Sequence, residues 1–140
     1  ESLLENEAGS INDGEIPRIP GMVIVPSLYP LNETSDNLIA AFDAAPENEF
    51  AAISHSNFAA SVGLTLEPNN LVIFGDPKLG IPFMQENQKA GLDLPQKLLV
   101  WEKNNQVYVG YNSVDYLKFR YDGIENAPTL DQIARVLLNF

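Results

Sequence analysis

The chain has 140 residues, of which 45% are hydrophobic and 19% charged, the size and composition of one globular domain. Its net charge of −11 repels phosphate backbones and anionic headgroups, which argues against binding to nucleic acid or to a membrane surface. The absence of cysteine excludes disulfides, thiolate metal sites and cysteine nucleophiles. No apolar run approaches the ~18–20 residues of a transmembrane segment.

Residues 1–20 are acidic and punctuated by Gly and Pro, without a sustained hydrophobic period. We expect this stretch to be a flexible N-terminal linker ahead of a single domain over 21–140. The chain opens at Glu1 rather than at Met, which fits removal of a leader as well as a trimmed chain.

The first elements of the domain are an edge strand and a helix. The apolar residues 23–25 predict a strand, and Pro26 places it at a sheet edge because proline cannot donate to a ladder. The stretch that follows, up to Pro46, is typical of an amphipathic helix with Thr34 or Ser35 as its N-cap.

The middle of the chain alternates strands with short helices. A strand over 50–54 leads directly into His55, and a short helix over 57–62 is closed by Gly63. The continuous apolar run 71–74 is typical of a strand that is covered on both faces.

The last third combines a hairpin with helices. We expect a helix over 81–90, paired strands over 98–101 and 107–111, and helices over 115–121 and 129–138. The resulting order is β-α-β-α-β-α-β-β-α-α. It predicts a compact α+β domain with a mostly antiparallel sheet and helices packed on one face.

Three features carry most of the possible chemistry. His55 is the one histidine and lies where a strand ends, a common place for functional side chains, although backbone bonding of the ring is the alternative. The Gly75-Asp76-Pro77 turn could bind an anion or ligand through its backbone amides, or it is simply a turn. Met84 could complete a copper or haem site with His55, or fill the core.

Several positions spread along the chain form one joint pattern: His55, Gly63, Phe74, Gly75, Asp76, Pro77, Met84, Asp93, Leu94, Pro95, Trp101 and Tyr111. This pattern resembles the domain of unknown function family DUF302 over roughly residues 23–140. The chain departs from the pattern at Asp76, where Asn is usual, and at Ile81, where Thr is expected.

The resemblance implies a compact α+β unit that is commonly a homodimer, and it brings no established reaction or cofactor. The stretch around Trp101 is similar to exported bacterial members of the family. It therefore implies a periplasmic or extracellular location, with a cytoplasmic location as the alternative.

The leading hypothesis is a small-ligand or metal-binding, or sensing, module of the bacterial cell envelope, with a cleft beside His55 and the turn 75–77. The first alternative is an enzyme in which His55 acts as general base with Asp76 or Asp93 as partner. The second is a haem or copper site that uses His55 and Met84. The third is a structural homodimer or partner-binding protein, with the aromatic hairpin as its interface.

Overall fold

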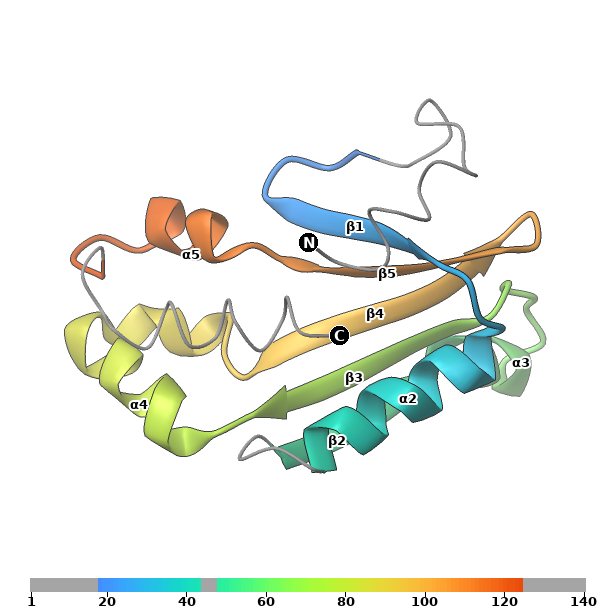
Figure 1. Ribbon diagram of the computed structural model, residues 1–140, viewed down its shortest axis with the longest axis horizontal. Coiled ribbons are helices and arrows are strands. Elements are labelled where there is room, and N and C mark those ends of the chain that lie inside the picture. Colours follow the sequence, from blue (N-terminus) through green and yellow to red (C-terminus); the bar gives the residue numbers. More distant parts are fainter. Residues whose placement is uncertain (1–17, 44–47, 125–140) are drawn as a thin grey trace.

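The computed structural model describes residues 18–43 and 48–124, and these form a five-stranded antiparallel sheet (Figure 1). The strand order is β1-β5-β4-β3-β2, so that β2 to β5 make a meander and β1 pairs with β5 at one edge. The strands are β1 (Met22–Ser27), β2 (Asn48–Ser54), β3 (Asn69–Gly75), β4 (Gln96–Lys103) and β5 (Gln106–Asn112). The predicted α+β class, the edge position of β1 and the hairpin are confirmed.

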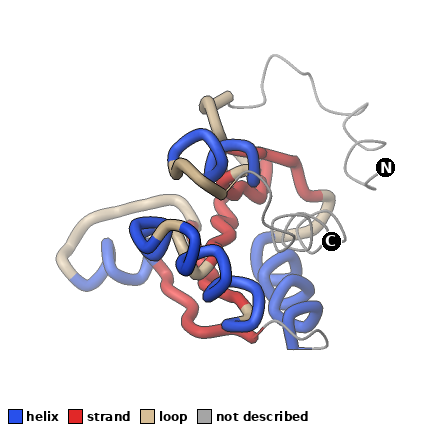
Figure 2. Tube along the Cα trace, turned by 90° about the vertical axis from the view of Figure 1, so that its left-hand side faces the viewer, coloured by secondary structure: helices blue, strands red, loops and turns tan. Residues whose placement is uncertain are grey.

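The helices lie along the sheet and at its two ends. They are α2 (Leu31–Asp43), α3 (His55–Ser61), α4 (Pro77–Glu86), the 3-10 helix η3 (Gln88–Leu92) and α5 (Val114–Arg120). Helix α2 runs along one face of the sheet, α3 lies at one end, and α4 and α5 lie at the other (Figure 1). Figure 2 shows α2 and α3 on opposite sides of the strands. The predicted closing helix and nearly all of the predicted linker lie outside the described residues.

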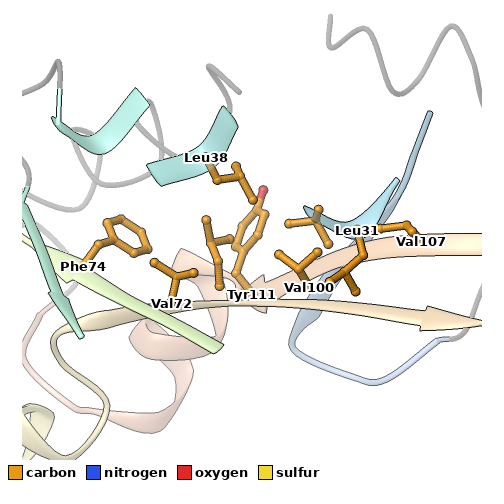
Figure 3. Close-up of a cluster of buried hydrophobic side chains, with 9 residues drawn as sticks. Leu31, Leu38, Val72, Phe74, Val100, Val107 and Tyr111 are labelled. Atoms are coloured by element: carbon orange, nitrogen blue, oxygen red, sulfur yellow. The ribbon is translucent and has the colours of Figure 1, made fainter. Parts of the chain in front are cut away.

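The main hydrophobic core lies between α2 and one face of the sheet, which we call the α2 face. Leu31 and Leu38 of the helix pack there on alternate strand residues (Figure 3). The strand residues of this cluster are Val72, Phe74, Leu98, Val100, Val107, Val109 and Tyr111. Complete burial of one such side chain contributes about 1.5–3 kcal/mol. A second cluster, around Phe83 and Leu117, joins α4, η3 and α5 at the end of the sheet.

The other face of the sheet is less well covered, and we call it the open face. Its half-buried apolar side chains are Ile24, Ile53, Leu71, Ile73, Leu99 and Trp101, whereas Tyr108, which stacks with Trp101 on this face, is buried. Within the described part of the chain, neither hydrophobic cluster includes any of them. Thus only one side of the apolar run 71–74 is fully buried, and the prediction that this strand is covered on both faces is wrong for the described residues.

Two helices begin earlier than predicted, one directly after a proline and the other at a proline. Helix α2 begins at Leu31, directly after Pro30, so Thr34 lies inside the helix and its hydroxyl donates to the Pro30 carbonyl at 2.9 Å. Helix α4 begins at Pro77, whose fixed φ suits a first helical position, and the Asp76 carboxylate accepts a hydrogen bond from the Lys78 amide at 2.9 Å. The predicted caps of α2 and the predicted start of α4 are therefore wrong.

The closing glycine of α3 and the β4–β5 turn follow the sequence prediction. Gly63 has a φ of +76°, the left-handed conformation that ends helices at glycine. Asn104 and Asn105 have φ values of 52° and 66°. Positive φ at both central residues is typical of the type I′ turn of a two-residue hairpin, and Asn tolerates it.

We predict that Gly110→Ala destabilises the fold, because Trp101 crosses the open face directly over this glycine. A Cβ at position 110 would collide with the Met22 Cε and would lie 2.9 Å from the Trp101 Cζ3. We expect a loss of about 1–3 kcal/mol in unfolding free energy, the usual cost of overpacking, measured by urea denaturation. Gly80→Ala is the matched control, since its Cβ would meet only Met84 at 3.8 Å. Equal stability of the two variants would contradict the packing of Trp101.

Candidate functional site

His55 lies where the edge strand β2 turns into α3. The Ser54 hydroxyl accepts a hydrogen bond from the Asn57 amide at 3.2 Å and so caps the helix. His55 is the first residue of the helix and its side chain is exposed. Among the described residues the imidazole has no hydrogen-bond partner, so it is available to solvent, to a ligand or to a partner protein.

The structure separates His55 from the Gly75-Asp76-Pro77 turn. Strands β2 and β3 are antiparallel, with Ser54 opposite Asn70 and Asn48 opposite Gly75. The two candidate positions therefore lie at opposite ends of β3, roughly 17 Å apart along the strand at about 3.4 Å per residue. The single cleft expected beside both of them is not formed within one subunit, because the prediction did not include the direction of β3.

The proposed catalytic and metal partners of His55 also lie at the far end of the sheet. Asp76 follows Gly75, and Asp93 precedes β4, whose Gln96 pairs with Phe74. Within one subunit neither carboxylate is the partner of His55, so the expected base–carboxylate pair is not formed.

Met84 is likewise remote from His55. Its Sδ lies 3.2 Å from the position that a Cβ on Gly91 would occupy, which places the thioether against η3. Helices α3 and α4 lie at opposite ends of the sheet (Figure 1). The expected site shared by His55 and Met84 is therefore not formed within one subunit. In the described part of the chain, no group of three or more His, Asp or Glu residues is placed to hold a metal ion.

Asp93 instead belongs to a polar cluster that ties α5 to the start of β4. Its Oδ2 accepts hydrogen bonds from the Tyr121 hydroxyl at 2.5 Å and from the Arg120 Nη1 at 3.0 Å. The same Arg120 nitrogen donates to the Tyr116 hydroxyl at 3.1 Å. The partners of Asp93 are 27 and 28 residues away in the chain, so no local pattern could have revealed them. The simplest role of this cluster is structural, because it holds the end of α5 against the residues that precede β4.

The exposed surface around α3 was missed by the sequence reasoning. We call α3 and the loop that follows it, residues 55–66, the α3 arm. None of the residues of α3 is buried. The large apolar side chains of the arm are strongly exposed: Phe58 at 63%, Val62 at 70%, Leu64 at 66% and Leu66 at 46%. The stretch 51–66 contains no Asp, Glu, Lys or Arg, and this was the signal available in the sequence.

An antiparallel five-stranded sheet with an apolar arm at one end defines an α+β fold but not a reaction. The sequence pattern of the family described as "Domain of unknown function DUF302" matches residues 23–140, and the chain belongs to this family. The crystal structure of an uncharacterized conserved DUF302 protein from Bacillus stearothermophilus is similar, with a TM-score of 0.67 and 22% sequence identity. The similarity covers 85% of this chain and 91% of that one, which shows the same fold.

Curated relatives are longer proteins. The chain is 34% identical over 102 residues to the fluoride-specific ion channel FluC 1 of Brucella suis biovar 1 (strain 1330), covering 72% of this chain and 40% of the relative. The fluoride-specific ion channel FluC 2 of Brucella melitensis biotype 1 matches with the same identity, over 38% of its length. The chain thus spans about two fifths of the curated relatives that it matches. No helix within residues 18–43 or 48–124 is long and apolar enough to cross a bilayer.

The Tyr121 hydroxyl gives a pH-dependent prediction. Burial of the ring, and then its hydrogen bond to Asp93, raise the pKa of Tyr121, and burial raises the pKa of Tyr111. The folded state thus holds these protons more tightly than the unfolded state does. This contribution to stability is complete below pH of about 10, the ordinary pKa of tyrosine, and is lost as the pH rises through the folded-state values.

We therefore predict that the unfolding free energy falls above a pH of about 10, and that it falls less steeply in Tyr121→Phe than in the unchanged protein. Urea denaturation at a series of alkaline pH values measures both slopes. Tyr29→Phe is the control, because that side chain is exposed. Identical slopes in the Tyr121→Phe variant and the unchanged protein would contradict the role of Tyr121.

Proposed function

We propose that this chain is a non-catalytic binding module that works as a homodimer and assembles through the α3 arm. The observation that carries the proposal is the exposure of Phe58, Val62, Leu64 and Leu66 on a stretch without charge. Exposed apolar patches of this kind mark interaction sites.

The free energy available from burying the apolar side chains of the arm favours the binding of a partner. Helix α3 has seven residues, and isolated helices of that length are marginal without tertiary packing. Complete burial of one large apolar side chain is worth about 1.5–3 kcal/mol. Because 46–70% of each of these four side chains is still exposed, a partner that covers the arm gains much of this free energy.

The distribution of charge allows a second copy of the same chain to bind at the arm. Two molecules of net charge −11 repel each other over most of their surfaces. The repulsion is smallest where no charged side chain is present, and the α3 arm is such a place. A two-fold axis lets the same patch serve on both subunits.

The longer relatives are consistent with a binding role. A segment similar to this chain forms about two fifths of proteins that are named fluoride-specific ion channels. Segments similar to this chain therefore occur within longer proteins named as ion channels, which is compatible with a module for assembly or sensing. Location in the cell envelope, implied by the resemblance to exported members, is part of this proposal and stays a prediction that cell fractionation checks.

We predict that Phe58→Asp converts the dimer to monomer, because it places a carboxylate in the apolar contact of both subunits. The expected cost is about 2 kcal/mol or more, as for other interface aromatics, or a roughly thirtyfold weaker Kd. Analytical ultracentrifugation over a concentration series measures it. Phe119→Asp is the matched control, because Phe119 is 87% exposed on α5 at the other end of the sheet. A monomeric parent protein, or equal effects of both substitutions, would overturn the proposal.

A small-ligand site beside His55 is a second candidate, favoured by one unpaired atom. The Asn69 Oδ1 is shielded from solvent and has no hydrogen-bond partner among the described residues. Asn69 pairs with Trp101 across the strands, at the same end of the sheet as His55. Trp101 in turn stacks on Tyr108, with ring centroids 5.4 Å apart. An unpaired buried oxygen costs about 1–3 kcal/mol, which a ligand that donates a hydrogen bond would recover.

This candidate predicts a bound small molecule that depends on His55 and Asn69. Native mass spectrometry of the purified protein is expected to show an added mass that is lost in His55→Ala and in Asn69→Leu. His55→Ala removes an exposed ring and is expected to fold normally, so a lost mass in that variant reports binding. If all three proteins carry no added mass, the ligand candidate is abandoned and the homodimer proposal is unaffected.

A further inference from the structure

We infer that the α3 arm of each subunit lies across the open face of its partner, so that each subunit's Trp101 is covered by the other subunit's arm. This inference rests on the proposed homodimer and adds the surface that receives the arm. Three observations carry it: the incomplete covering of β3, the position of the arm, and the distribution of charge over both surfaces.

Strand β3 has the sequence of a strand with two buried faces. Its residues 71–74 are continuously apolar, a pattern found where both faces of a sheet are covered. Val72 and Phe74, beneath α2, are 1% and 2% exposed, whereas Leu71 and Ile73 on the open face are only half-buried. The second cover that this pattern implies is absent from the described part of the chain.

The arm stands on the open-face side of the sheet, opposite α2 (Figure 2). Its apolar side chains are 46–70% exposed, so most of their surface does not pack on the subunit's own sheet. The adjoining edge strand β2 also presents Ala51 and Ala52 to solvent on its two faces. An exposed apolar arm and an incompletely covered apolar face therefore adjoin on the same side of one molecule.

The distribution of charge is compatible with a second copy in this contact. The open-face positions of β1, β3, β4 and β5 carry no acidic residue, and their charged side chains are Lys97 and Lys103, towards the two ends of β4. The arm carries no charge. Two acidic molecules can thus join arm to face without bringing carboxylates together.

The self-complementary arrangement also favours the chain itself over a different protein. In an isologous dimer the arm of one subunit meets the face of the other, and the two-fold axis repeats that contact. One association then covers both apolar surfaces of each subunit. An unrelated partner would have to supply both a matching groove and a matching projection.

The composition of the chain allows a test that reports only contacts between subunits. The protein has one tryptophan and no cysteine. A nitroxide label is attached to Val62→Cys in a Trp101→Phe background, which gives a subunit that quenches but does not emit. This subunit is mixed in excess with unlabelled, unchanged protein, and the fluorescence of Trp101 is recorded after subunit exchange. Ultracentrifugation of the same mixture checks that dimers are present.

We expect loss of most of the Trp101 fluorescence, because nitroxides quench at contact range. The same label on Phe119→Cys in the same background is the control and is expected to leave the fluorescence unchanged. Leu64→Cys is a second arm position, used if the Val62 variant does not fold. Dimers without quenching by either arm label overturn the docking inference and leave the homodimer intact. Equal quenching by the Phe119 label also overturns it. Absence of dimers overturns the homodimer and this inference together.

Discussion

The packing of α2 on one face of the sheet is the constraint on which the other features depend. The helix carries the chain from β1 at one edge to β2 at the opposite edge, and Leu31 and Leu38 are buried against the intervening strands. The meander from β2 to β5 then returns to pair with β1. Because α2 covers only one face, the apolar residues that alternate to the other face are left for a different cover.

Antiparallel pairing also determines where the chemistry-bearing residues lie. In a parallel arrangement, side chains that follow two neighbouring strands would meet at one edge of the sheet. Here β2 and β3 run in opposite directions, so His55 and the Gly75 turn are at opposite ends. Asp76 and Asp93 serve structure where they are, the first as a helix cap and the second as the acceptor for Tyr121 and Arg120. His55 is left as the first residue of an apolar arm rather than beside an acid.

The sequence predicted those elements whose signals are local. Alternating or continuous apolar residues located the strands, the Asn104-Asn105 pair fitted the hairpin turn, and Gly63 marked the end of α3. The starts of α2 and α4 were misplaced because Pro30, directly before α2, and Pro77, the first residue of α4, were not recognised as signals of a helix start. The candidate site required knowledge of strand direction, and the Asp93 cluster required contacts between distant segments. Neither is encoded in a short window of residues.

The α3 arm and the open-face positions of β1, β3, β4 and β5 present apolar side chains and carry no acidic residue, although the chain as a whole is strongly acidic. A strongly acidic composition keeps copies of a protein apart, yet this chain leaves its most exposed apolar helix without a single charge. Natural sequences normally protect such a surface with charged side chains when it has no partner. The lack of that protection on the arm, together with a β3 sequence suited to two buried faces, is expected of surfaces that are covered in the working protein. The proposed assembly through the arm would remove both apolar surfaces from water, whereas chemistry at His55 alone would leave them exposed.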